Sequence, residues 1–220
     1  MNKKSLVVGA LGATIVAAIA GNQTNLKNLT YEVERVVDGD TFVTKENQMI
    51  RLTGVDAPEL ENCDGPEAKK ALEKIISGKK LYLKVIYKDS SDRLISHVYN
   101  DQGLVATQMA ALGMAYYTQT GISDPGLKTA YLTAKQEKIG IFSSKCTQIS
   151  NISNSKCPIK GNVHKPGNTK LYRFPGCGQY NNTDVQLFWG DKWFCTESEA
   201  QEAGFTKGSD CFNKSWHPGQ

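Results

Sequence analysis

The chain carries little excess charge of either sign. Its 220 residues include 26 lysines and arginines against 22 aspartates and glutamates, a formal net charge of +4. This mild excess permits an acidic partner but does not resemble the dense basic face of a dedicated DNA-binding protein. Hydrophobic residues make up 40% and charged residues 22%, which is ordinary for a globular protein and argues against disorder along the whole length.

A hydrophobic run long enough to span a membrane is also lacking. The apolar stretch LVVGALGATIVAAIA at residues 6–20 is shorter than the roughly 20 residues that a membrane span needs. Lys3 and Lys4 precede it, and Ala18-Ile19-Ala20 fits the small-x-small pattern before a cleavage point. We therefore predict a secretory signal peptide over residues 1–20, with an uncleaved membrane anchor as the alternative. In either case we expect an exported protein, secreted or tethered to the extracellular surface.

Histidine is scarce, with three in the chain. None stands in a motif that would activate a serine or cysteine nucleophile. His97 is expected to lie on the face of a β-strand and to have no catalytic role. The cysteine number is even, which in an exported protein favours disulfides over free thiols. The six cysteines are Cys63, Cys146, Cys157, Cys177, Cys195 and Cys211.

The composition divides the rest of the chain into segments. After a polar tether at 21–30, the strand-like runs YEVERVV, TFVTK and MIRLTGV precede a helical pattern from Pro66 to Gly78. Two more strand-like runs, KLYLKVIY and RLISHVYN, precede two further helical segments. This order predicts a fold that is mainly β plus α, a five-stranded OB-type barrel with about three helices over residues 31–143.

The remainder is expected to be a linker and a small second domain. The Ser- and Asn-rich stretch at 144–156 reads as a linker. Residues 157–211 hold four cysteines and few aliphatic residues, and a unit this small needs covalent or metal staples. Residues 212–220 follow as a short tail, and Thr196 with Glu199 predicts a capping box at the start of a short helix.

Acidic and basic side chains gather in VVDGDTF at 36–42 and RLTGVDAPEL at 51–60. Each acid alone would be unremarkable in a turn or beside a helix start, but together they can point at one place. Hard oxygen ligands suit Ca²⁺ or Mg²⁺, and the lack of a nearby histidine or cysteine disfavours zinc. A cation with two arginines would bind phosphodiester oxygens, and a further carboxylate would activate water. The residues concerned are Asp38, Asp40, Arg51, Asp56, Glu59 and Arg93.

These segments, followed by SDRLISHVY, resemble the staphylococcal-type thermonuclease family over residues 31–142. The resemblance implies an OB-barrel fold and calcium-dependent hydrolysis of nucleic acid. It further implies Ca²⁺ ligation by Asp40, Asp56 and the backbone carbonyl of Ala57. Asp38 would support these ligands without contacting the ion itself. Glu59 would activate water, and Arg51 and Arg93 would bind the phosphate.

The sequence departs from the family pattern just before Arg93. Ser90 and Ser91 stand where a Lys-Tyr pair that grips a terminal phosphate is expected, so the preference for chain ends is left open. Tyr116 or Tyr117 could stack on a base, although aromatic residues after a helix more often belong to the core.

Position along the chain suggests how the cysteines pair. Cys63 and Cys146 lie at the ends of the nuclease-like region, which predicts a bridge between them. For the second domain we predict Cys177–Cys195 and Cys157–Cys211. Zinc binding by the four cysteines is the alternative, although they contain no C-x-x-C spacing.

The second domain resembles small modules appended to bacterial secreted nucleases, and its ligand is not readable from the sequence. Its lysines and aromatics could touch nucleic acid or the cell envelope. Taken together, the sequence predicts a secreted Ca²⁺-dependent nuclease that acts on DNA, with RNA as a further candidate substrate and little sequence specificity. No obligate protein partner is implied. The alternative is a non-catalytic surface protein that binds nucleic acid or cell wall through the same fold.

Overall fold

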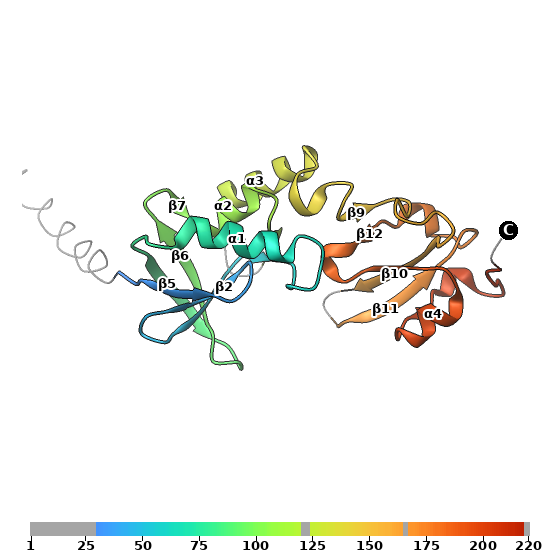
Figure 1. The fold of residues 1–220 in the computed structure, drawn as a ribbon, viewed down its shortest axis with the longest axis horizontal. Helices are drawn as coiled ribbons and strands as arrows, with labels where there is room; N and C mark the ends of the chain where they lie inside the picture. The colour runs from blue at the N-terminus through green and yellow to red at the C-terminus, as the bar shows by residue number, and fades with distance from the viewer. Residues whose placement is uncertain (1–29, 120–123, 165–166, 218–220) are drawn as a thin grey trace, which may run out of the picture.

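The computed structural model describes residues 30–119, 124–164 and 167–217 (Figure 1). The predicted signal peptide lies outside these residues, as do nearly all of the predicted tether and the last three residues of the chain. Within the described ranges, every helix is too short or too polar to cross a bilayer.

One mixed sheet organises the first domain, with strand order β1-β2-β3-β6-β5. Neighbouring strands are antiparallel except β3 and β6, which run parallel with Arg51 opposite Ile95. The two edges of the sheet meet at an isolated antiparallel bridge, in which Tyr31 and Leu81 exchange backbone hydrogen bonds of 2.9 and 3.1 Å. The predicted OB-type fold is confirmed, with one residue pair joining the sheet edges. The strands are β1 (Val33–Val36), β2 (Thr41–Thr44), β3 (Met49–Leu52), β5 (Tyr82–Lys88) and β6 (Leu94–Asn100).

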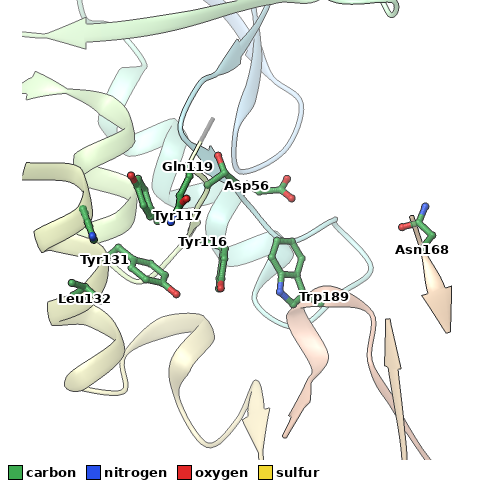
Figure 2. A pocket seen from close by; sticks show the side chains of 10 residues that line it. Asp56, Tyr116, Tyr117, Gln119, Tyr131, Leu132, Asn168 and Trp189 are labelled. Carbon is green, nitrogen blue, oxygen red and sulfur yellow. The ribbon is translucent and has the colours of Figure 1, made fainter. Parts of the chain in front are cut away.

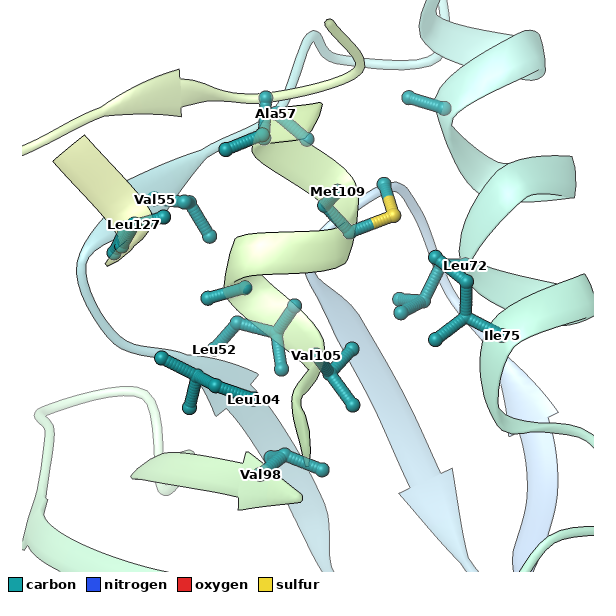
Figure 3. Packing of buried hydrophobic residues seen from close by; sticks show 14 of the residues in the cluster. Leu52, Val55, Ala57, Leu72, Ile75, Val98, Leu104, Val105, Met109 and Leu127 are labelled. Carbon is teal, nitrogen blue, oxygen red and sulfur yellow. The ribbon is translucent and has the colours of Figure 1, made fainter. Parts of the chain in front are cut away.

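Three helices cover this sheet, as predicted: α1 (Gly65–Ile76), α2 (Val105–Ala111) and α3 (Pro125–Gln136). Figure 3 shows Leu72 and Ile75 of α1 facing Val105 and Met109 of α2 across the core. The helical spacing of these apolar residues is why each helix buries one side. Asp64 occupies the cap position of α1, but its side chain makes no cap bond and instead accepts a 2.6 Å bond from Lys145.

Short strand pairs were not predicted from the sequence. β4 (Val55–Asp56) pairs with β8 (Tyr116–Tyr117), and β7 (Gly103–Leu104) pairs with β6. Two residues are too few to show the alternation that marks a strand. The β4–β8 register places Asp56 directly opposite Tyr116, so this pair brings a predicted site residue next to an aromatic one.

The C-terminal unit has its own four-stranded sheet, in the order β13-β10-β11-β14 (Figure 1). Half of the buried residues of its separate small core are aromatic, among them Tyr172, Phe174 and Phe194. The predicted capping residue Thr196 accepts a bond from the backbone N–H of Glu199 at 3.2 Å. The elements are β10 (Ile159–His164), β11 (Thr169–Arg173), β13 (Lys192–Phe194), α4 (Glu197–Glu202) and β14 (Thr206–Lys207), with 3₁₀ turns at Tyr180–Asn182 and Ser209–Cys211.

The predicted bridge between Cys63 and Cys146 is present. The other two predicted pairs are wrong: the structure joins Cys157 to Cys195 and Cys177 to Cys211. Sheet register accounts for the first, because Ile159 lies opposite Phe194 and carries the preceding Cys157 beside Cys195. The second is held by Gly178, whose N–H bonds the carbonyl of Asp210 at 3.2 Å. All six cysteines are therefore bridged, and zinc binding by them is excluded.

The two domains meet through an ordered junction. β9 (Thr147–Gln148) falls within the segment predicted to be a linker, and it pairs with β12 (Val185–Gln186) of the C-terminal unit. The N–H of Leu187 donates to the carbonyl of Cys146 at 2.8 Å. Phe188, 1% exposed, is buried in the core of the first domain. The 3₁₀ turns on either side of this junction are η1 (Gly140–Phe142) and η3 (Leu187–Trp189).

Candidate active site

The turn between β1 and β2 positions two of the predicted acids. The carboxylate of Asp38 accepts a 3.0 Å bond from the N–H of Asp40, which fixes the turn. Between them, Gly39 has no room for a side chain, since an added Cβ would lie 2.6 Å from the Cβ atoms of both Ala57 and Ala68. This close approach brings the turn against the chain corner that carries the other acids.

Asp40 links the two corners directly. Its side chain is buried and accepts bonds from the hydroxyl of Thr41 at 2.8 Å and the N–H of Ala57 at 2.9 Å. Burial raises the pKa of this carboxyl to about 6, against the opposing pull of the Arg51 guanidinium. The charge of the neighbouring Asp38 contributes to the raised pKa. Asp40 is thus a buried acid whose ionised form needs a positive partner.

Arg51 provides that partner from the middle of β3. One nitrogen, Nη2, lies 3.1 Å from an oxygen of Asp40 and 2.7 Å from an oxygen of Asp56. The other, Nη1, donates to the carbonyls of Leu52 and Val55, both at 3.3 Å. These four contacts fix the guanidinium in one position, with its side chain 21% exposed.

Arg93 is fixed by a carboxylate of its own. Its Nε and Nη2 each lie 2.9 Å from the same oxygen of Asp89, and the Asp89 side chain also accepts from the backbone N–H of Arg93 at 3.0 Å. Arg51 and Arg93 line one cavity of about 270 Å³, together with Thr53 and Tyr87. The parallel pairing of β3 with β6 explains this meeting, because it places the start of β6 beside Arg51.

The oxygen atoms at this corner are possible ligands for a hard cation such as Ca²⁺. The carboxylates of Asp40 and Asp56 converge on one nitrogen of Arg51, and the carbonyl of Ala57 follows in the chain. Among the described residues, three-ligand clustering of His, Cys, Asp or Glu occurs only at Cys63, Asp64 and Cys146, where the two sulfurs are already bridged. A cation at the predicted site would therefore rest on two carboxylates and backbone oxygen, a donor set that suits Ca²⁺ or Mg²⁺.

Glu59 is the predicted site residue that the structure does not bring into contact with the others. It is exposed, in the loop between β4 and α1, and its side chain makes no hydrogen bond or ion pair within the described part of the chain. Its backbone carbonyl accepts from Asn62 at 2.9 Å. It is also absent from the lining of the arginine cavity.

A second and larger cavity, of about 900 Å³, has Asp56 in its lining. Figure 2 shows Tyr116 between Tyr131 and Trp189, with Asp56 at the rim. From the sequence, Tyr116 or Tyr117 could stack on a base or, more commonly for such residues, belong to the core; both are partly buried against the core, and both line this cavity. Trp189 was missed, because nothing in the sequence indicates that η3 would pack beside β8.

Fold and site together define an OB-type domain with two fixed arginines above paired carboxylates, a class suited to phosphodiester chemistry. Residues 49–144 match the family described as staphylococcal nuclease homologue. An uncharacterized endonuclease of Escherichia coli O157:H7 is 30% identical over 115 residues, covering 50% of this chain and 75% of that protein. An uncharacterized endonuclease of Haemophilus influenzae is 30% identical over 146 residues, covering 64% of this chain and 80% of that protein. A probable staphylococcal-like nuclease of Oryza sativa subsp. japonica is 32% identical over 110 residues, covering 50% of this chain and 33% of that protein.

The chain belongs to the staphylococcal nuclease family. It is accordingly a nuclease, a phosphodiester hydrolase whose substrate is nucleic acid. The family is generally metal-dependent, in keeping with the paired carboxylates of Asp40 and Asp56.

Proposed function

We propose that this protein is an exported, Ca²⁺-dependent nuclease that cleaves DNA, and RNA as a second substrate, with little sequence preference. The observation that carries the proposal is the cavity shared by Arg51 and Arg93. Its size and its two guanidinium groups suit a single phosphodiester. Contacts to phosphate carry no sequence information, which is why little specificity is expected.

The two arginines would act as preorganised donors. A guanidinium presents a planar fork that matches two phosphate oxygens. Arg51 is held by Asp40 and Asp56, and Arg93 by Asp89, so neither side chain has to be ordered when substrate binds. Donors fixed in advance stabilise the charge that develops on the phosphate during attack.

Asp40, Asp56 and the carbonyl of Ala57 would hold the Ca²⁺, with Asp38 supporting Asp40 through the bond to its N–H. When bound, the ion neutralises the two carboxylates and polarises a phosphate oxygen as a Lewis acid. The raised pKa of Asp40 supports this assignment, since a buried acid gains most from an added positive charge. Calcium rather than magnesium is expected from the family resemblance.

Glu59 would serve as the general base. An exposed carboxylate without protein partners can accept a proton from an attacking water. Its position in the loop after β4, three residues beyond Asp56, keeps it near the proposed cation ligands. The proton would pass from the water to a carboxylate oxygen of Glu59.

Export is supported by the cysteines as well as by the N-terminal sequence. All six are bridged, and such bridges persist in oxidising compartments. Contact of the C-terminal unit with the cell envelope stays a prediction.

The experiment uses supercoiled plasmid and the oxidised protein without its first 20 residues, compared in Ca²⁺, Mg²⁺ and EDTA. We expect nicking only in Ca²⁺, or far faster nicking in Ca²⁺ than in Mg²⁺ or EDTA. The nicking rate of Arg93→Gln should be lower than that of the wild type by about 100-fold or more. Arg35→Gln, which removes an exposed arginine on β1, is the control and should cleave as the wild type does. Equal cleavage in EDTA would refute calcium dependence, and full activity of Arg93→Gln would refute the arginine site.

A further inference from the structure

The larger cavity joins the two domains. Tyr116, Tyr117 and Tyr131 line it from the nuclease domain, and Trp189 lines it from the C-terminal unit. The ring of Tyr116 lies 5.1 Å from that of Trp189 and 5.2 Å from that of Tyr131, measured between centroids. An aromatic wall is therefore built from two parts of the chain that are far apart in sequence.

Asp56 connects this cavity to the arginine site. Asp56 lies at its rim (Figure 2), and the same carboxylate pairs with Arg51 at 2.7 Å. Asp56 also sits opposite Tyr116 in the β4–β8 pair. If one phosphate of a nucleic-acid strand lies in the arginine cavity, the adjoining nucleotide of that strand can thus contact the aromatic wall.

Contacts other than those of Trp189 also attach the C-terminal unit. The neighbouring Phe188 is 1% exposed and fills the core of the first domain. Its carbonyl accepts from Asn62 at 3.3 Å, and the β9–β12 pair adds a second connection. Trp189 packs against the same core and against the rings of Tyr116 and Phe188, but it is only half-buried, and part of its surface lines the cavity.

We propose that Trp189 and Tyr116 form a stacking site for an unpaired nucleobase of the substrate, so that the C-terminal unit completes the nuclease's substrate-binding surface. Aromatic faces accept any base, because every base has a π-face. Bases in a duplex are already stacked on their neighbours, so the site favours single strands. Lys128, exposed on α3 at the same cavity, supplies a positive charge for the adjoining phosphate. This inference rests on the proposed nuclease function.

Binding in EDTA tests the stacking site without cleavage. The probes are a short labelled oligothymidylate and the same strand with every base removed, each titrated with the full oxidised protein. We expect Trp189→Leu to weaken binding of the thymidylate strand about 5- to 100-fold and to leave the abasic strand unchanged. Trp189→Phe should restore most of the loss, since it returns an aromatic face.

Trp193→Leu is the matched control. Trp193 is a half-buried tryptophan of the same unit that donates to Gln148 at 2.7 Å and does not line the cavity; its variant should bind both strands as the wild type does. Unchanged thymidylate binding in Trp189→Leu, or equal weakening of both strands, would overturn the proposal. Because no cation is present, the result stands whether or not the Ca²⁺-dependent cleavage is found.

Discussion

Arg51 and Asp56 are joined by a 2.7 Å contact between Nη2 and Oδ1, and the same nitrogen lies 3.1 Å from Asp40. One guanidinium thus connects the sheet to both chain corners that carry the predicted cation ligands. Because Arg51 also faces the cavity shared with Arg93, its position couples the acids to the phosphate site.

Arg51→Lys should separate charge from geometry. Lysine keeps the positive charge but cannot contact two carboxylates and two carbonyls at once. We expect a loss of about 1–3 kcal/mol in the free energy of unfolding, from buried acceptors left unpaired, and a fall of about 100-fold or more in cleavage. Denaturant unfolding and plasmid nicking measure the two effects, with Arg35→Lys as the control. Wild-type activity in Arg51→Lys would contradict the assignment.

Gly39→Ala should disturb the site by packing alone. The new methyl group would lie 2.6 Å from Ala57 and Ala68, so the β1–β2 turn has to move away from the corner that holds Asp56. We expect about 1–3 kcal/mol of destabilisation and reduced affinity for Ca²⁺, measured by denaturant unfolding and by the Ca²⁺ dependence of cleavage. Unchanged stability would show that the turn is not packed as described.

His97→Gln tests a titration outside the site. Burial, and then the charge of Lys84, lowers the pKa of His97 below its ordinary 6.5. As the pH falls through this range the unfolded chain binds the proton first, so His97 contributes stability above pH 6.5 that is lost at lower pH.

The wild type should therefore lose stability relative to His97→Gln between pH 7 and pH 5, as measured by unfolding at a series of pH values. Cleavage at neutral pH should stay within about twofold, since His97 has no proposed catalytic role. A stability difference that does not change with pH, or a large loss of cleavage, would be inconsistent with this account.

The Cys63–Cys146 bridge should stabilise the junction between the domains. It spans 83 residues of sequence and lies beside the Lys145–Asp64 contact and the Leu187–Cys146 hydrogen bond. Replacing both cysteines by serine should cost about 2–4 kcal/mol, measured by denaturant unfolding under oxidising conditions. The reduced wild type should lose at least as much, and no difference between the oxidised forms would show that the bridge does not form.

The longer strands and helices were predictable from the sequence, whereas the two-residue strands were not. The spacing of Leu72, Ile75 and Ile76 reports the side that α1 buries. Features that depend on two distant segments were not. Cys157 pairs with Cys195 because β10 lies beside β13, and no local pattern encodes that register.

The candidate site divides in the same way. Asp38, Asp40, Arg51 and Asp56 lie in two short segments with recognisable motifs, and the structure brings the last three into contact. Trp189 reaches the cavity only because the domains pack together. Glu59 was predicted from the motif, and the structure shows an exposed side chain that leaves its role to experiment.

The most direct test of the central claim is the rate of Ca²⁺-dependent plasmid nicking by Glu59→Gln beside Glu61→Gln. Both changes remove the charge of an exposed carboxylate from the same loop, so folding and net charge are matched. The account predicts a loss of about 100-fold or more in Glu59→Gln and wild-type nicking in Glu61→Gln. Equal nicking by the two variants would show that Glu59 is not the base.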